Sequence, residues 1–322
     1  MRKLSTLAAA LALWATPAAG QGAEIEAPGP SGPLKGSWLQ AAQANAPVVL
    51  IVPGSGPTDR DGNSPAGITA APYRMLAEAL AAKGVSSARV DKRGMFGSAA
   101  AGDPNAASVR GYTDDIRSWV RTLRQRSGAR CIWVLGHSEG ALMALATAAS
   151  SDEGICGTIL VSGTGRKLGD VLREQLRASP PFAPHLDKAL PALERLEAGQ
   201  RVDTTGMEPL LLSLFAPQVQ DYLIDLLAQD PAALAARVRV PMLVVQGQRD
   251  LQTTEADARR IASANPAARL VLLPNVNHVL KVVESDTREA NAATYGNSTL
   301  PIALAVVEAV AGFVQGAGNN GR

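Results

Sequence analysis

Short apolar runs alternate along this chain with stretches whose spacing is typical of helices. The run VVLIV at 48–52 is apolar at every position, as in a strand that is buried on both faces. Such alternation predicts a mostly parallel sheet with helices on both faces, because parallel strands need crossover connections. The expected strands are 48–52, 87–91, 131–135, 157–161, 242–246 and 270–273, and the expected helices are 73–83, 113–124, 140–149, 256–264 and 304–314.

After the expected strand at 157–161 the alternation stops, and the pattern becomes helical but is interrupted by prolines. A loop of this length without secondary structure is uncommon in a compact domain. We therefore expect residues 165–237 to form a helical cap over one end of the sheet. The α/β core then comprises 37–164 and 238–322.

The N-terminus has the three parts of a secretory signal peptide. Two basic residues precede the apolar run 4–14, and the small residues Ala18 and Gly20 suit cleavage. The apolar run is too short for a permanent membrane anchor. We expect residues 1–20 to be removed on export, which leaves the protein in the periplasm or outside the cell. Residues 21–36, rich in Pro, Gly and Ala, are expected to be a flexible leader.

Charge and composition exclude several classes of partner. The chain has 31 Lys and Arg against 29 Asp and Glu, and two of the basic residues lie in the expected signal peptide. The mature chain is therefore formally neutral, which favours neither nucleic acid nor an anionic membrane surface. Two cysteines without clustered histidines make no metal site, and no G-x-G-x-x-G indicates a cofactor. We expect a small-molecule substrate, while the sequence leaves the oligomeric state open.

The two cysteines each stand at or just before the start of a strand-like run. Cys131 precedes IWVL and Cys156 precedes GTILV. If these strands are neighbours in a parallel sheet, the two sulfurs lie at the same edge, and an exported protein permits a disulfide. This arrangement favours a Cys131–Cys156 disulfide over two buried thiols.

The segment GHSEG at 136–140 matches the pattern G-x-S-x-G. It follows one expected strand directly and opens an alanine-rich helix. A serine on such a sharp strand-to-helix turn projects its hydroxyl beyond the carboxyl end of the strand. The alternative, a glycine-rich turn with an incidental serine, does not require this placement. We predict that Ser138 is a nucleophile.

A serine hydroxyl needs a general base, and the chain has three histidines. His137 lies inside the turn, so its side chain should point elsewhere and pack, and His185 lies in the expected cap. His278 follows the last expected strand, at the carboxyl edge of the sheet where active sites of such folds collect. We predict that His278 is the base.

The carboxylate that orients the base should also follow a strand. Asp250 lies in the loop after the strand at 242–246, whereas its rival Asp257 lies on an expected helix. The resulting order Ser, Asp, His is that of α/β-hydrolases and differs from the orders in chymotrypsin and subtilisin. We predict a triad that Asp250 completes.

An oxyanion hole needs two donors aimed at the developing charge. The first expected donor is the backbone N–H of Glu139, directly after the nucleophile. The second should come from the loop after the strand at 48–52, where glycines on both sides of Ser55 allow close approach. We assign it to the Ser55 N–H.

Five segments together resemble bacterial α/β-hydrolases of the esterase and serine-aminopeptidase-like group. They are GSGPTDRDG at 54–62, DKRG at 91–94, GHSEG at 136–140, QGQRD at 246–250 and NHVLK at 277–281. The resemblance implies an α/β-hydrolase fold and carboxylesterase activity. The chain departs from many relatives at the start of the oxyanion loop, where Pro53-Gly54 replaces His-Gly.

The expected reaction is hydrolysis of small or short-chain aliphatic esters through an acyl-enzyme, without a cofactor. Alternatives are a peptidase of the aminopeptidase type, a lactonase or acyl-transferring enzyme, and a non-catalytic binding protein on the same fold. The charged segments 59–61 and 91–93 follow strand ends near the expected site. They either bind a polar substrate group or pair with each other, and we favour pairing.

Overall fold

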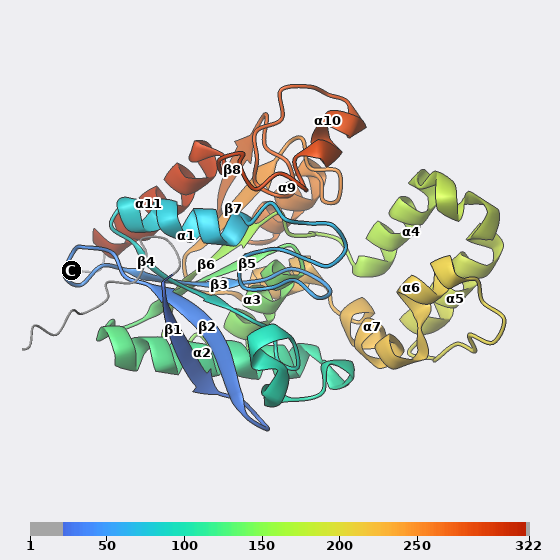
Figure 1. Ribbon diagram of the computed structural model, residues 1–322, viewed down its shortest axis with the longest axis horizontal. Helices are drawn as coiled ribbons and strands as arrows, with labels where there is room; N and C mark the ends of the chain where they lie inside the picture. Colours follow the sequence, from blue (N-terminus) through green and yellow to red (C-terminus); the bar gives the residue numbers. More distant parts are fainter. Residues whose placement is uncertain (1–21, 320–322) are drawn as a thin grey trace, which may run out of the picture.

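The computed structural model describes residues 22–319, in which an eight-stranded sheet forms the centre (Figure 1). The strand order is β1-β2-β4-β3-β5-β6-β7-β8, with parallel pairing from β4 onward and antiparallel pairing of β1 with β2 and of β2 with β4. The strands are β1 Ala23–Pro28, β2 Pro33–Leu39, β3 Val48–Val52, β4 Ser86–Val90, β5 Ile132–His137, β6 Ile155–Val161, β7 Met242–Gly247 and β8 Arg269–Leu273.

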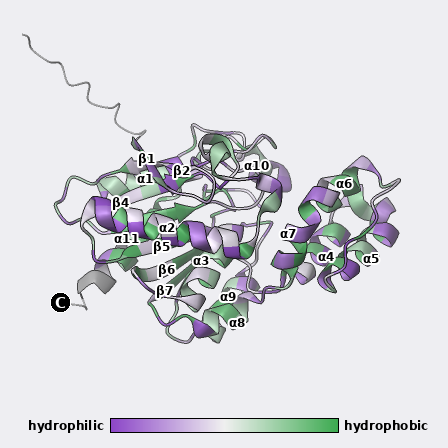
Figure 2. Cartoon of the chain, turned by 90° about the horizontal axis from the view of Figure 1, so that it is seen from below, coloured by the Kyte–Doolittle hydropathy of each residue, from purple (hydrophilic) through white to green (hydrophobic). Residues whose placement is uncertain are grey.

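Helices cover both faces of this sheet, which confirms the predicted fold class (Figures 1 and 2). Side chains alternate along each strand. In β5, Trp133 and Leu135 pack toward α1 and α11, whereas Ile132 and Val134 pack toward α2 and α3. The core helices are α1 Pro72–Ala82, α2 Val109–Ser127, α3 Glu139–Ser150, α9 Glu255–Ala264, α10 Arg288–Ala293 and α11 Leu304–Asn319.

The expectation of a flexible leader at 21–36 is wrong, because β1 and β2 form a hairpin there. Ile25 and Leu34 are buried while their neighbours along the strands are partly or fully exposed, so the hairpin has one apolar face against the core. The glycines and prolines that suggested flexibility lie largely in its turn. The expected signal peptide, 1–20, lies outside the described residues.

The insertion after β6 contains five α-helices, of which α4 to α7 lie beyond the carboxyl ends of the strands (Figure 1). Helices α4 to α7 form a small core of their own, around side chains such as Leu193, Leu211 and Phe215. The last helix, α8, falls within the expected cap 165–237 but packs against α3 and α9 of the main core. The helices are α4 Leu168–Ala178, α5 Leu186–Glu197, α6 Pro209–Phe215, α7 Gln220–Leu227 and α8 Pro231–Arg237.

The segment Pro209–Leu227 has the length and apolar composition of a membrane-spanning helix. In the structure it is divided into α6 and α7 by a short 3₁₀ turn at Pro217–Val219. Phe215 and Leu223 are buried in the core of the cap. Its apolar residues are therefore accounted for by packing within the cap.

Cys131 and Cys156 form the predicted disulfide, with their Cα atoms 5.0 Å apart. The bond joins the starts of β5 and β6, which are neighbouring parallel strands. It therefore lies at the edge of the sheet opposite the strand ends that carry Ser138.

Candidate active site

Ser138 occupies a strained turn between β5 and α3. Its backbone angles are φ 55° and ψ −120°, which a non-glycine residue adopts only when its surroundings impose them. The chain passes so close to itself that a Cβ on Gly136 would lie 2.0 Å from the carbonyl oxygen of Gly140. A glycine at 136 is therefore required. The Ser138 N–H donates to the Val161 carbonyl (2.9 Å), and its hydroxyl makes no capping bond to α3.

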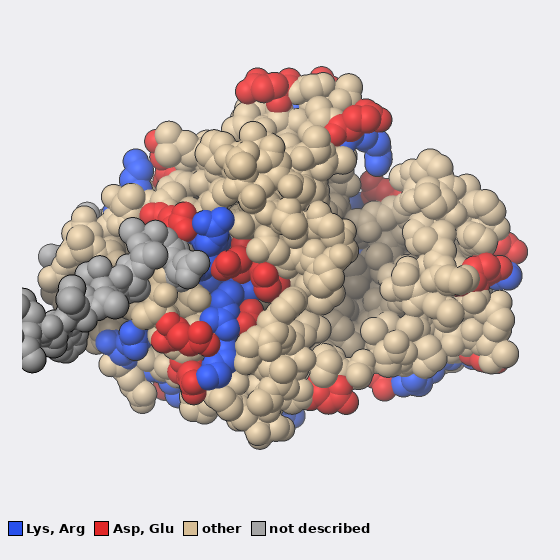
Figure 3. All heavy atoms as spheres, viewed as in Figure 1, with Lys and Arg blue, Asp and Glu red and all other residues tan. Residues whose placement is uncertain are grey.

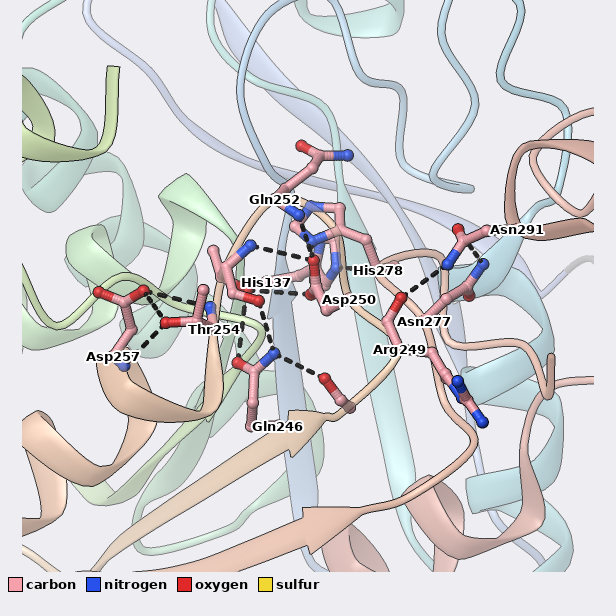
Figure 4. Close-up of polar contacts among 12 residues, drawn as sticks. His137, Gln246, Arg249, Asp250, Gln252, Thr254, Asp257, Asn277, His278 and Asn291 are labelled. Carbon is pink, nitrogen blue, oxygen red and sulfur yellow. Dashed lines mark hydrogen bonds and ion pairs between the residues drawn. The ribbon is translucent and has the colours of Figure 1, made fainter. Parts of the chain in front are cut away.

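The side chains of Asp250 and His278 are hydrogen-bonded to each other (Figure 4). Nδ1 of His278 and Oδ2 of Asp250 are 2.8 Å apart, and both side chains are buried. The other acceptor positions of the carboxylate are also used. Oδ1 accepts from the N–H groups of Gln252 (2.8 Å) and Thr253 (3.0 Å), and Oδ2 accepts from the Thr253 hydroxyl (2.9 Å).

These contacts keep Asp250 charged. Burial alone raises the pKa of its carboxyl group, but the charge and hydrogen bond of His278 and the two N–H donors outweigh burial. The pKa of Asp250 therefore lies well below its ordinary value. A carboxylate that is ionised and fixed in this way holds Nδ1 of the imidazole protonated and leaves Nε2 free as a base.

His137 is buried as predicted, but it also takes part in a hydrogen-bonded chain that the sequence did not reveal. Its Nε2 donates to the carbonyl oxygen of His278 (2.8 Å), which can only accept. Burial lowers the pKa of His137 to about 3, so the ring is neutral and Nδ1 accepts from the Tyr73 hydroxyl (2.8 Å). Tyr73 in turn accepts from the N–H of Gly54 (3.1 Å). These three hydrogen bonds connect the loop after β3 to the loop that carries His278.

A cavity of about 520 Å³ lies between the core and the cap, and Ser138 lines it. Figure 3 shows the hollow between the two parts, with mostly uncharged surface along its visible walls. Side chains from the cap helices supply much of the apolar lining, including Leu172 of α4, Leu214 of α6 and Leu223 of α7. The cavity therefore offers an apolar binding site directly above the serine.

Ser55 and Glu139, the two expected oxyanion donors, line the same cavity. Within residues 22–319 neither backbone N–H has a hydrogen-bond partner. The N–H of Gly54 is occupied by Tyr73. Two unpartnered N–H groups therefore belong to residues that line the cavity together with Ser138.

The rival residues lie elsewhere. Asp257 is fully buried, caps α9 through Thr254 and pairs with Arg166, so it stabilises a helix. His185 lies in the cap, 3.9 Å from Glu208.

The charged segments mostly pair, as we favoured. Asp91 binds Arg60 (2.6 Å) and Arg93 binds Asp115 (2.6 Å). Lys92 differs from these neighbours, because it faces the cavity.

The sequence also missed a bond between cap and core: the hydroxyl of Tyr222 on α7 donates to the carboxylate of Glu139 (2.8 Å). The contact of Tyr222 could not be predicted from the sequence, because a helical pattern does not show which residue of a cap helix will contact the core.

Comparison with known proteins agrees with the fold and the motifs. Esterase EstD from Thermotoga maritima is 30% identical over 241 residues, 73% of this chain and 54% of that protein, so the chain spans about half the length of this relative. Proline iminopeptidase from Mycobacterium smegmatis is similar in structure, with TM-score 0.57 and 12% identity over 93% of this chain and 100% of that one.

A thermophilic esterase from Thermogutta terrifontis gives TM-score 0.56 with 17% identity, over 92% of this chain and 99% of that one. These structural likenesses show the α/β-hydrolase fold. Residues 67–286 match the family model described as serine aminopeptidase, S33. The chain therefore belongs to this family, within the esterase-like group of α/β-hydrolases that its motifs resemble.

Proposed function

We propose that this protein is a serine hydrolase that cleaves carboxylic esters through an acyl-enzyme intermediate. The observation that carries the proposal is the 2.8 Å hydrogen bond between the buried Asp250 carboxylate and His278. Gln252 and Thr253, whose N–H groups bind this carboxylate, line the same cavity as Ser138. A non-catalytic binding protein has no need for an oriented imidazole beside a strained serine.

In the proposed reaction, the Ser138 hydroxyl attacks the ester carbonyl while Nε2 of His278 takes its proton. The negative oxygen of the tetrahedral intermediate accepts hydrogen bonds from the N–H groups of Ser55 and Glu139. The imidazolium then protonates the leaving alcohol. Water attacks the acyl-enzyme by the same route in reverse and releases the acid and free Ser138.

The proposed substrates are small or short-chain aliphatic esters. The leucines that line the cavity favour an apolar acyl group, and burial of each methylene contributes about 0.8 kcal/mol. The name of the relative that is 30% identical in sequence, an esterase of Thermotoga maritima, supports ester cleavage.

We also propose that the protein is exported, to the periplasm or beyond. The Cys131–Cys156 disulfide supports this location, since disulfides persist in oxidising compartments. Fractionation of cells that produce the full chain checks it. Retention of the intact chain in the cytosol contradicts the proposal.

The test of function is hydrolysis of p-nitrophenyl acetate, butyrate and octanoate by the mature protein, beside Ser138→Ala. We expect the wild type to turn over at least one ester and the variant to lose 10³-fold or more, roughly the loss seen when a nucleophile is removed. Activity that survives the substitution contradicts the assignment of Ser138. A wild type that cleaves aminoacyl amides or lactones but no esters contradicts the substrate class.

A further inference from the structure

Lys92 is a buried basic side chain beside the cavity that the proposed reaction does not use. It is only 8% exposed, and its Nζ donates to the carbonyl oxygen of Gly54 at 2.7 Å. Its neighbours Asp91 and Arg93 are occupied by ion pairs with other elements. Burial lowers the pKa of this amine, and its Nζ is held in one place by the hydrogen bond to the Gly54 carbonyl.

The acceptor of Lys92 belongs to the peptide group that carries the Ser55 N–H. A trans peptide is planar, and its C=O and N–H point in opposite directions. The described residues contain no cis peptide bond. Fixing the Gly54 oxygen on the side of Lys92 therefore fixes the Ser55 N–H on the opposite side.

Ser138 lies close to this peptide group. A Cβ built on Gly54 would be 3.2 Å from Cβ of Ser138, so the loop passes directly beside the nucleophile. The preceding N–H, on Gly54, is held by the Tyr73 hydroxyl. Gly56, with φ 63° and open space around its Cα, gives the next segment little restraint of its own. Lys92 and Tyr73 therefore hold the C=O and the N–H of Gly54, while the carbonyls of Ser55 and Gly56 bond to Thr58 within the same loop.

We propose that Lys92 is a positioning residue for the oxyanion hole. It holds the Gly54–Ser55 peptide in the orientation that directs the Ser55 N–H toward the tetrahedral intermediate. Because hydrogen bonds along a chain polarise one another, the bond from Lys92 to the Gly54 oxygen also makes this N–H a stronger donor. The inference rests on the proposed function, since it concerns the donor that the proposed reaction uses.

The alternative role for a cation at this place is to bind an anionic group of the substrate. The surroundings of Lys92 argue against it. The Glu139 carboxylate lies on the same cavity, and the Tyr112 ring lies 6.0 Å from Nζ. The ammonium already donates to Gly54, so a substrate carboxylate has to compete with this bond and with the charge of Glu139.

The test compares Lys92→Met with Lys281→Met in the mature protein. Lys281 is a matched control, because its buried ammonium also donates to a backbone carbonyl, that of Leu300 (2.6 Å), but it does not line the cavity. For each variant we would measure kcat and KM on p-nitrophenyl butyrate, Tm, and the inhibition constant of an alkyl trifluoromethyl ketone. The adduct of this ketone with a serine carries an oxyanion.

We expect Lys92→Met to lower kcat about 10²-fold, as loss of one oxyanion donor does, and to weaken the trifluoromethyl ketone by a similar factor with KM nearly unchanged. Lys281→Met is expected to lower Tm while both quantities stay within about threefold of wild type. Should Lys92→Met fail to fold, Lys92→Gln removes the charge with a shorter amide and is expected to show the same joint loss.

Three outcomes overturn the inference. In the first, kcat and ketone affinity change no more in Lys92→Met than in Lys281→Met. In the second, KM alone rises, which assigns Lys92 to substrate binding. In the third, the wild type hydrolyses no ester and resists phosphonylation by a fluorophosphonate, which overturns the proposed function and the inference together.

Discussion

The Asp250 carboxylate touches His278 through Oδ2 at 2.8 Å and is held by its other contacts to the backbone of its own loop. The loop thus fixes the carboxylate first, and the carboxylate fixes the imidazole. These contacts explain why a side chain three residues after the end of β7 can be a rigid partner for His278. The backbone of residues 250–253 sets the position of the carboxylate, and the carboxylate sets the orientation of the His278 ring.

Replacing Asp250 by Asn keeps the shape of the side chain but removes the charge. We expect kcat on p-nitrophenyl butyrate to fall by about 10³ to 10⁴, because the imidazole loses its fixed tautomer and the stabilisation of its charged form. The matched control is Asp257→Asn. That aspartate is equally buried but binds Arg166, so its loss should lower the free energy of unfolding and leave kcat close to wild type. Equal losses of kcat in both variants would falsify the assignment.

The hydrogen-bonded chain through His137 predicts a pH-dependent stability. Burial lowers the pKa of His137 to about 3, whereas an unfolded chain has a histidine pKa of about 6.5. Between these values the unfolded state binds more protons, so stability from neutral His137 is complete above about pH 6.5 and is lost as the pH falls. His137→Gln removes this dependence, since its amide can still bond to Tyr73 and the His278 carbonyl but does not titrate.

The difference in unfolding free energy between wild type and His137→Gln should therefore shrink by about 2 kcal/mol from pH 7 to pH 5. Urea unfolding at the two pH values measures it. The other histidines are present in both proteins and cancel. A difference that is constant with pH means that His137 does not lose its proton on folding.

The core of the fold could be predicted from the sequence because burial on two faces leaves a strong pattern. VVLIV at 48–52 and the run at 242–246 read as strands for this reason, and β3 and β7 begin where expected. β1 and β2 were missed because their signal is weak. Only Ile25 and Ala27 of β1 face the core, and the hairpin turn carries the Pro and Gly residues that resemble a leader.

Placement of the candidate site followed from chain order and strand ends, which parallel topology brings to one edge. This reasoning was sufficient to predict Ser138, Asp250 and His278 as the candidate triad. Lys92 was visible only as part of a charged segment whose members looked equivalent, since ion pairing depends on which elements become neighbours. Arg93 reaches Asp115 on α2, and Asp91 reaches Arg60, while Lys92 turns to Gly54. No local sequence pattern shows that these three adjacent side chains have different partners.

The leucine-lined cavity predicts how acyl-chain preference responds to its walls. Leu172 of α4 lines the cavity and is half-buried, so Leu172→Trp should fill space that a longer acyl chain occupies. We expect kcat/KM for octanoate to fall about tenfold relative to that for acetate, which corresponds to roughly 1.4 kcal/mol of lost apolar contact. Leu190→Trp on α5 is the control, because Leu190 packs on the core of the cap without lining the cavity. An unchanged ratio in Leu172→Trp places the acyl chain elsewhere.

The disulfide predicts a loss of stability without loss of activity. Cys131 and Cys156 are separated by 25 positions, and closing a loop of that length stabilises a fold by about 3 kcal/mol through the entropy of the unfolded chain. The variant Cys131→Ala/Cys156→Ala should therefore unfold at lower urea concentration. Its kcat on p-nitrophenyl butyrate should stay near wild type, because the bond joins the starts of β5 and β6 while Ser138 follows the end of β5.

Either single variant, Cys131→Ala or Cys156→Ala, serves as the control for this prediction. Each removes the cross-link as completely as the double variant does, so all three should unfold at similar urea concentrations, and adding dithiothreitol should lower the midpoint of the wild type alone. A double variant as stable as the wild type shows that removing the disulfide does not raise the conformational entropy of the unfolded chain. Loss of kcat in that variant, at a urea concentration where it remains folded, shows instead that strain at the start of β5 reaches the turn at its other end.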